Sequence, residues 1–458
     1  IGIVERGITF FKSEFYAVDK AGTTRKLPLP LGADLKGVSG GELIFLARDN
    51  WTPRGGKPIA KGSLVAFDVQ DFTEKNATPA FEVLFTPDAR GAIEDVSPGR
   101  NAVYAAIFEN VTGAIHEFRR DRSGAWNDTA LDLPKGGSTH IVDCDAWTPQ
   151  CFFTFESFLQ PVTLYSFDGT GAPRAIKSEP ARFDASGLVS EQFEAASADG
   201  TKIPYFFIHA KDARGPQATI LYGYGGFELS LEPWYWNDGH RPLDTGQTWL
   251  TKGGAIAVAN IRGGGEFGPK WHDAALKMHR QRAYDDFEAV AADIEHRGLA
   301  AAQQLGSVGA SNGGLLVSTT MVERPELFGA VVCQRPLIDM LRYTHYGAGA
   351  SWVGEYGDPA DPTMRAAILK YSPYENLKPG VKYPPVLFIT ETSDDRVTPV
   401  FARMMAAKME SAHQNVMFYE SMEGGHGPGA THEEQAEMWA LSYAYFAQKL
   451  GLRASARQ

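Results

Sequence analysis

The chain has 458 residues, 43% of them hydrophobic and 22% charged, which indicates a soluble globular protein of two or three domains. Its formal net charge is -11 and it contains no dense run of Lys and Arg, so neither nucleic acid nor an anionic membrane is an expected partner. No apolar run approaches the roughly 20 residues that a membrane span needs.

The chain begins with Ile rather than Met, and no signal peptide is visible at its start. We therefore expect a further N-terminal region to precede it in the natural protein. We also expect a monomer in the cytoplasm, with the periplasm as the alternative location.

Residues 1–190 contain short apolar segments separated by turns. Two series of segments recur with the same step of 49 residues, from 102 to 151 and from 113 to 162. A repeat of this length made only of strands is typical of β-propeller blades, which must stack to cover their apolar faces. We predict a partial β-propeller of about three to four blades, with an ordinary β-sandwich as the alternative. The expected strands are residues 43–46, 62–68, 102–106, 113–118, 151–155 and 162–168.

The chain has three cysteines, Cys144, Cys151 and Cys333. An odd, low count argues against a disulfide-built scaffold, and no nearby group of His or Cys completes a metal site. We therefore expect three ordinary thiols.

Residues 195–458 change to an alternation of strands and helices, which predicts a mostly parallel sheet with helices on both faces. One amphipathic helix is indicated by the spacing of Tyr284, Phe287, Val290 and Ile294. The strands expected here are residues 218–222, 255–259, 305–308 and 386–390, and further helices are expected at 315–319 and 433–450.

Residues 309–313, Gly-Ala-Ser-Asn-Gly, fit the G-x-S-x-G pattern between a strand-like and a helix-like run. This is the context of a nucleophile elbow, in which small residues allow a tight turn that exposes the hydroxyl of Ser311 at a helix N-terminus. A glycine turn with a chance serine is the alternative. The pattern predicts an α/β-hydrolase domain with Ser311 as its nucleophile.

A serine nucleophile needs a base, and the base needs an orienting partner. Asp394 follows the strand at 386–390, and His426 lies in a glycine-flanked loop before the last helix. The chain order Ser, Asp, His is the order of this hydrolase architecture, and both loops leave the carboxyl ends of strands. We predict that Asp394 orients His426 as the base. Their rivals are Asp395, His345, His413 and His432.

The oxyanion of the reaction needs two hydrogen-bond donors. One is expected to be the backbone N–H of Asn312, which follows the nucleophile. Tyr224, in the glycine-rich turn after the strand at 218–222, is placed to supply the other through its hydroxyl, unless Tyr222 and Tyr224 are core aromatics. The turn at 260–268 lacks the Gly-Lys-Ser/Thr ending of a P-loop, so we expect a structural role for it. Acyl transfer needs neither a metal ion nor an organic cofactor, so we expect none.

These stretches, with 352–356 and 394–397, make residues 195–450 similar to the prolyl oligopeptidase family of serine peptidases. The resemblance implies cleavage of short peptides after proline, with Trp352 stacked on the proline ring and Arg396 holding a substrate carbonyl. It also implies that Asn312 forms one wall of an apolar pocket. The other pocket residues that it implies are Phe227, Leu337, Tyr356 and Val397.

Arg335-Pro336 departs from the small apolar step that the family would place beside the pocket. One rival function is a related peptidase that cleaves after basic residues, for which Glu355 and Asp358 lie nearby in the sequence. The others are an esterase and a propeller-hydrolase without activity that serves as a binding module.

Overall fold

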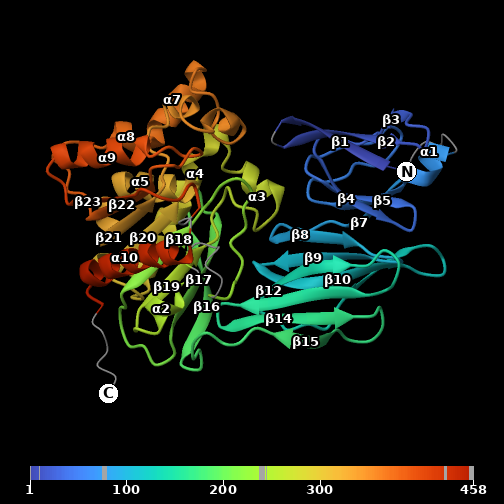
Figure 1. Ribbon diagram of the computed structural model, residues 1–458, viewed down its shortest axis with the longest axis horizontal. Coiled ribbons are helices and arrows are strands. Elements are labelled where there is room, and N and C mark those ends of the chain that lie inside the picture. Colours follow the sequence, from blue (N-terminus) through green and yellow to red (C-terminus); the bar gives the residue numbers. More distant parts are fainter. Residues whose placement is uncertain are drawn as a thin grey trace.

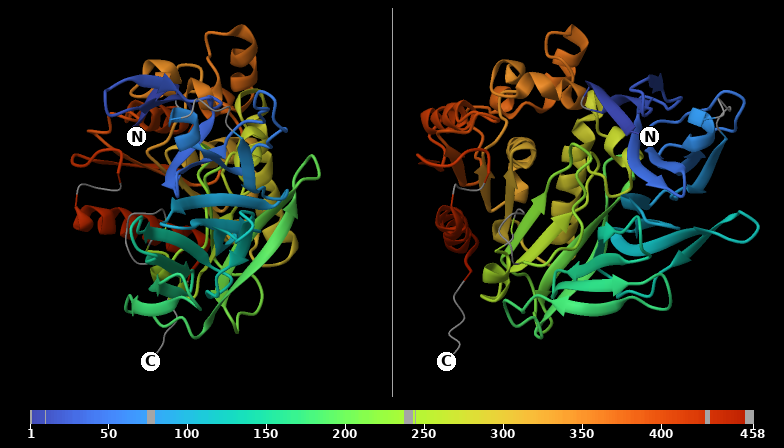
Figure 2. Two further views of the ribbon diagram at one scale, coloured as in Figure 1. Left: turned by 90° about the vertical axis from the view of Figure 1, so that its right-hand side faces the viewer. Right: turned by 45° about the vertical axis from the view of Figure 1, so that its right-hand side comes forward.

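The computed structural model describes residues 2–9, 11–74, 80–236, 243, 245–427 and 431–452. The described chain forms a stack of small antiparallel sheets beside a larger α/β part (Figures 1 and 2). The small sheets come from the N-terminal residues and follow one another in chain order. The architecture is thus a propeller-type domain followed by an α/β-hydrolase domain.

Three of the small sheets have four strands each in the simple up-and-down order of propeller blades. The strands predicted from the 49-residue repeat are confirmed as β5, β6, β9, β10, β13 and β14. A three-stranded sheet precedes the three blades and comprises β1 (Gly2–Thr9), β2 (Lys12–Val18) and β3 (Thr24–Lys26). The blades comprise β4 (Ala33–Ser39), β5 (Glu42–Ala47), β6 (Leu64–Asp68) and β7 (Phe81–Phe85), then β8 (Gly91–Pro98), β9 (Val103–Glu109), β10 (Thr112–Arg120) and β11 (Trp126–Ala130), then β12 (Ser138–Cys144), β13 (Cys151–Ser157), β14 (Gln160–Phe167) and β15 (Arg174–Ser178).

The inner strand β9 explains why these sheets stack. Val103 and Ala105 point into the apolar cluster shared with the preceding blade, whereas Tyr104 and Ala106 point into the cluster shared with the following one. Successive side chains of a strand point to opposite faces of the sheet, so a strand that is apolar at every position is buried on both faces. Each blade therefore depends on its neighbours for its core.

The prediction of three free thiols is wrong. Cys144 and Cys151 are direct partners in the register of β12 and β13, and they form a disulfide with their Cα atoms 4.2 Å apart. Strand register, which a cysteine count does not contain, brings the two sulfur atoms together. Cys333 is a buried free thiol.

The α/β part is built on one eight-stranded sheet in the order β16-β17-β19-β18-β20-β21-β22-β23. The pairs from β19 to β23 are parallel, and β16 and β17 add an antiparallel edge. The expected strands at 218–222, 255–259, 305–308 and 386–390 are confirmed. The strands are β16 (Leu188–Ala196), β17 (Lys202–Ala210), β18 (Thr219–Gly223), β19 (Ala255–Ala259), β20 (Leu305–Ala310), β21 (Ala330–Gln334), β22 (Val386–Glu391) and β23 (Val416–Ser421).

Helices cover both faces of this sheet (Figure 1). Leu221 on β18 points into a cluster with side chains of α4, α5 and α9, whereas Ile220 and Tyr222 point into a second cluster with α2 and α10. The helices are α1 (Val69–Glu74) in the propeller part and α2 (Gln247–Leu250), α3 (Pro269–Asp273), α4 (Gln281–His296), α5 (Asn312–Glu323), α6 (Val353–Tyr356), α7 (Pro362–Tyr371), α8 (Pro373–Asn376), α9 (Val400–Ser411) and α10 (His432–Leu450) in the α/β part. None of the described helices combines the length and the apolar character that crossing a membrane requires.

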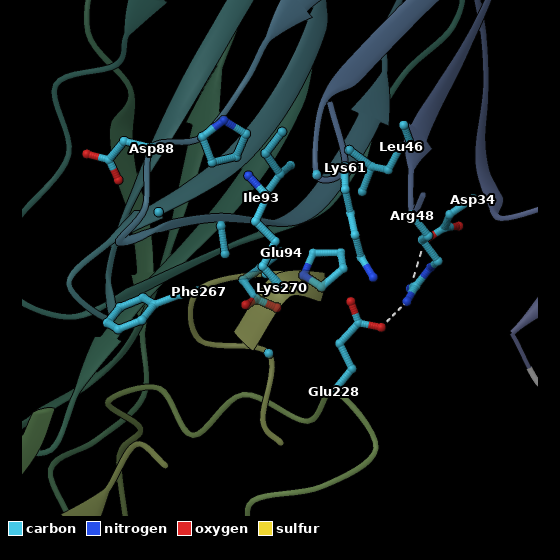
Figure 3. Close-up of a pocket in the computed structure, with 18 of the residues that line it drawn as sticks. Asp34, Leu46, Arg48, Lys61, Asp88, Ile93, Glu94, Glu228, Phe267 and Lys270 are labelled. Atoms are coloured by element: carbon cyan, nitrogen blue, oxygen red, sulfur yellow. Dashed lines mark hydrogen bonds and ion pairs between the residues drawn. The ribbon is translucent and has the colours of Figure 1, made fainter. Parts of the chain in front are cut away.

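The two parts of the chain meet at a polar pocket (Figure 3). Arg48, which follows β5, pairs with Asp34 of β4 at 3.2 Å and with Glu228 of the loop after β18. Lys61 of the propeller part forms a second ion pair with Asp273 of α3. These contacts join the blades to the side of the α/β part on which the candidate site lies.

Candidate active site

Ser311 lies at the sharp turn between β20 and α5. Its backbone has φ 58° and ψ -118°, a conformation that L-residues rarely adopt. A side chain on Gly309 would collide with the carbonyl oxygen of Gly313, so the turn closes only with glycine at that position. The backbone N–H of Ser311 donates to the Gln334 carbonyl of the next strand at 3.0 Å. The strained turn therefore holds the serine hydroxyl above the sheet.

Three side chains from three separate loops form one hydrogen-bonded chain at this edge of the sheet. His426 Nε2 lies 3.1 Å from Ser311 Oγ, and His426 Nδ1 lies 2.8 Å from Asp394 Oδ2. Such an arrangement allows the imidazole to accept the serine proton while the carboxylate stabilises the imidazolium.

Asp394 is itself fixed in place. Its carboxylate is fully buried, and Oδ1 accepts the backbone N–H groups of Arg396 at 3.0 Å and Val397 at 2.9 Å. The bend after β22 therefore holds one carboxylate oxygen and leaves the other for His426. The four rival residues, Asp395, His345, His413 and His432, are all exposed.

The two expected oxyanion donors lie beside Ser311. Asn312 is the first residue of α5, so its backbone N–H belongs to the unpaired first turn of the helix. Tyr224 is half-buried, and its phenol interacts with Ser311 and with the charge of Arg396. Burial raises the pKa of Tyr224 against these two interactions, so its hydroxyl keeps its proton. Tyr222, by contrast, is a core residue.

The residues implied for the pocket separate into buried and exposed members. Trp352, Tyr356, Leu337 and Val397 all lie in the apolar cluster on the α4 face of the sheet, and Phe227 packs against that cluster. The ring of Phe227 meets that of Tyr356 edge-on at 5.7 Å. Arg396 is exposed, and its carbonyl accepts the backbone N–H of Ala348 at 3.1 Å, which ties the segment before Trp352 to the Asp394 bend.

The glycine-rich turn at 260–268 is tied into the surrounding structure by its polar side chains. Arg262 makes hydrogen-bonded ion pairs with Asp286 of α4 at 2.6 Å and with Asp199 at 2.5 Å. Glu266 accepts the backbone N–H of Leu231 at 3.0 Å. These contacts are structural in kind. Among the described residues, no group of three His, Cys, Asp or Glu side chains is placed to hold a metal ion.

Comparison with known proteins matches both parts of the fold. Residues 243–453 match the prolyl oligopeptidase family, and residues 36–179 match the prolyl oligopeptidase N-terminal beta-propeller domain. The chain belongs to the prolyl oligopeptidase family. The first matched segment contains Ser311, Asp394 and His426.

Several relatives match almost the whole chain or most of it. An uncharacterized peptidase of Sinorhizobium fredii is 44% identical over 451 residues, which are 97% of this chain and 61% of that protein. A prolyl endopeptidase of Elizabethkingia meningoseptica is 32% identical over 363 residues, 77% of this chain and 50% of its own length. The solved structure of a post-proline cleaving enzyme from Rickettsia typhi superposes with a TM-score of 0.90 at 34% identity, covering 98% of this chain and 65% of that one. The chain thus spans 50% to 65% of the length of these family members.

Sequence reasoning missed how several buried polar residues pair behind the site. Arg280 and Glu355 form an ion pair that is almost fully buried, and His272 shares the carboxylate of Glu355. Arg335 has φ 42° and turns its guanidinium toward Glu391. No local pattern could have revealed these pairs, because their members lie 56 to 83 residues apart.

Proposed function

We propose that this chain carries the active site of a serine endopeptidase that hydrolyses short peptides on the carboxyl side of proline. The observation that carries the proposal is the hydrogen-bonded chain from Asp394 through His426 to Ser311, with the serine in a strained strand-to-helix turn. Membership of the prolyl oligopeptidase family supports the same reaction.

In the first step, Ser311 Oγ attacks the carbonyl carbon of the proline residue itself, and its proton passes to His426 Nε2. The carbonyl oxygen becomes an oxyanion, which accepts hydrogen bonds from the Asn312 N–H and the Tyr224 hydroxyl. The imidazolium then gives its proton to the leaving amine as the peptide bond breaks. Asp394 holds the imidazole in the required tautomer and balances its charge.

In the second step, water attacks the acyl carbonyl carbon and passes a proton to His426. The ester bond to Ser311 breaks, the serine oxygen recovers its proton from the imidazolium, and the peptide acid leaves. The same two donors stabilise the second oxyanion, so one arrangement serves both halves of the reaction.

Preference for proline is supported by the apolar group of Trp352, Tyr356, Val397 and Phe227 near the site. A proline ring is compact and apolar, and the residue lacks an N–H, so an aromatic surface suits it without a polar partner. The exposed guanidinium of Arg396 is free of the apolar cluster and serves to bind a backbone carbonyl of the substrate.

Cleavage after basic residues is less well supported by the acidic groups nearby. Both oxygens of Glu355 already have partners, because Arg280 and the Phe227 N–H bind Oε1 and His272 binds Oε2. Asp358 is exposed and accepts the backbone N–H of Ala360. A substrate lysine or arginine would therefore find the buried Glu355 already occupied, and only the exposed Asp358 left to pair with.

The test compares hydrolysis of a Gly-Pro reporter amide with that of an Arg reporter amide and a reporter ester. We expect turnover of the Gly-Pro amide, little turnover of the Arg amide, and labelling of the protein by a fluorophosphonate probe. Ser311→Ala should abolish turnover and labelling, whereas Ser393→Ala, an exposed serine beside Asp394, should leave both unchanged.

Each other outcome has a distinct meaning. Faster cleavage of the Arg amide would overturn the proline preference, and hydrolysis of the ester alone would indicate an esterase. Labelling that persists in Ser311→Ala would refute the choice of nucleophile. Absence of both turnover and labelling in the wild-type chain would favour a binding module without activity.

A further inference from the structure

The side chain of Asn312 joins both oxyanion donors to one buried network. Its Nδ2 donates to the backbone carbonyl of Tyr224 at 2.6 Å, and its Oδ1 accepts from Arg280 Nη2 at 2.6 Å and from the Tyr356 hydroxyl at 2.7 Å. Asn312 is 0% exposed, so no water competes for these groups. The residue whose backbone N–H faces the oxyanion is thus held at its other end by three neighbours.

Arg280 connects this amide to the wall of the pocket. Arg280 is the residue before α4, and its side chain is 0% exposed. Its Nη1 donates to Glu355 Oε1 at 2.9 Å, and its Nη2 donates to Asn312 Oδ1. Glu355 lies in α6 between Trp352 and Tyr356, and the same Oε1 accepts the backbone N–H of Phe227 at 3.0 Å. One planar guanidinium therefore bridges two groups that belong to different sides of the site.

The backbone at Gly226 passes so close to this network that no side chain fits beside the guanidinium of Arg280. A Cβ atom at Gly226 would lie 2.6 Å from Asn312 Nδ2 and 3.1 Å from Arg280 Nη2. Any side chain at this position would displace the hydrogen bond between Arg280 and Asn312. Gly226, two residues after Tyr224, is therefore matched to the buried arginine.

The network stays charged although it is buried. Burial acts to raise the pKa of Glu355, but the hydrogen bond from His272 and the positive charge of Arg280 hold that pKa below its usual value. In a dry environment an ion pair with this geometry resists displacement, because neither charge can be left without the other.

We propose that Arg280 is a positioning residue for acyl transfer. Its guanidinium holds the Asn312 carboxamide in place, and with it the Asn312 N–H and the Tyr224 loop. Because the same guanidinium binds Glu355, these groups keep a fixed position relative to the pocket wall. The proposal rests on the proposed peptidase function and deepens it. An oxyanion donor is effective only about 2.7–3.1 Å from the position of the developing charge, so a loosened Asn312 costs rate even when substrate still binds.

The mildest test removes one hydrogen bond from the network and nothing else. Tyr356→Phe deletes the hydroxyl that binds Asn312 Oδ1 and keeps the ring. Tyr343→Phe is the matched control, because Tyr343 is equally buried, packs edge-on against Tyr356 at 5.5 Å, and donates its hydroxyl to the Gly357 carbonyl at 2.7 Å. We expect Tyr356→Phe to lower kcat for the Gly-Pro amide roughly tenfold with KM changed less than about threefold. Tyr343→Phe should leave both within about twofold.

The stronger test replaces the guanidinium itself. In Arg280→Lys the charge remains, but one ammonium cannot reproduce the planar fork that reaches Glu355 and Asn312 together. We expect kcat to fall about a hundredfold. Arg262→Lys is the control, since Arg262 is also buried and paired with Asp286 but touches no residue of the site.

A further measurement compares the affinity for a peptidyl prolinal, an aldehyde, with the affinity for the matched prolinol, an alcohol. A purely structural role of Arg280 would not change the ratio of these two affinities. With the aldehyde, Ser311 Oγ adds to the carbonyl carbon, its proton passes to His426, and the oxygen becomes an oxyanion; the alcohol forms no such bond. Tyr356→Phe should weaken aldehyde binding by the same factor as kcat and leave alcohol binding unchanged.

The outcomes separate this inference from the function on which it rests. A wild-type chain that neither cleaves the Gly-Pro amide nor binds the aldehyde contradicts the proposed function. An active wild type whose Tyr356→Phe and Arg280→Lys variants keep the wild-type ratio of aldehyde to alcohol affinity overturns the positioning role of Arg280. Should Arg280→Lys fail to fold, as its Tm will show, Tyr356→Phe alone decides.

Discussion

The guanidinium of Arg335 lies 2.9 Å from the carbonyl oxygen of Gly427, the residue that follows His426. The same Nη1 atom pairs with Glu391 Oε1 at 3.1 Å, and both side chains are buried. Arg335 follows β21 and Glu391 ends β22, so the ends of two neighbouring strands reach across to the loop of the proposed base. The arginine that departs from the family pattern is therefore a support of the histidine loop.

Replacing Arg335 should reduce activity through His426. In Arg335→Gln the loop loses its charged anchor, and we expect fluorophosphonate labelling of Ser311 to slow about tenfold while KM for the Gly-Pro amide changes little. Arg403→Gln is the control, because Arg403 also pairs with a glutamate, Glu420, but on the exposed surface. A lower Tm with an unchanged rate of labelling would mean that Arg335 is structural only.

The ion pair between Arg48 and Glu228 should hold the propeller part against the α/β part (Figure 3). Reversing one charge, as in Arg48→Glu, places three carboxylates together because Asp34 also faces this position. We expect Tm to fall by about 2–4 °C and limited proteolysis between the two parts to become faster. The double exchange Arg48→Glu with Glu228→Arg should restore most of the loss. If it restores nothing, the pair does not hold the two parts together.

Local sequence patterns were enough to predict much of the architecture. The 49-residue repeat predicted the inner strands of the blades, and the glycines around Ser311 predicted the turn after β20, because steric demands at a turn or in a stacked sheet act on adjacent residues. Four strands of the large sheet, β16, β17, β21 and β23, were not predicted. At the two edges, β16 is mostly exposed and β23 has no buried residue, so the apolar signal that marks a buried strand is weak in them.

Contacts between distant segments were beyond local reasoning. Asn312 was expected to contribute its backbone N–H and a pocket wall, but its side chain is the centre of the buried network with Arg280 and Tyr356. The disulfide was missed for a similar reason, since it depends on the register of β12 against β13. The hydrogen bonds of Asp394, His426 and Ser311 were easier to expect, because sheet topology brings the loops at one strand edge together.

Thiol counting tests the disulfide directly. Since Cys144 and Cys151 are joined and Cys333 is buried, the folded chain should react slowly with a thiol reagent, and the unfolded, unreduced chain should show one reactive thiol. Three should appear after reduction. Cys333→Ala should leave no reactive thiol in the unreduced unfolded chain, and two or more there would contradict the pairing.

Glu266 should make the fold less stable as pH rises. The residue is 3% exposed, and within the described part of the chain its Oε2 atom has no hydrogen-bond partner. Burial raises the pKa of Glu266 to about 8, with the neighbouring Glu94 acting in the same direction. The folded state therefore keeps a proton that the unfolded chain releases near its ordinary pKa of 4.5. The resulting stabilisation is complete below that value and is lost as pH rises through about 8.

We therefore expect Tm to decrease between pH 5 and pH 8.5, and to decrease less in Glu266→Gln, whose amide does not titrate. The difference corresponds to a free energy of unfolding on the order of a few kcal/mol across the window. Glu109→Gln, at an exposed carboxylate of the β9 strand, is the control for removing one acid from the propeller part. Scanning calorimetry of the three proteins at matched ionic strength makes the comparison. Parallel curves for the wild type and Glu266→Gln would mean that Glu266 is already ionised in the fold, because only a group that changes protonation on unfolding contributes to the slope.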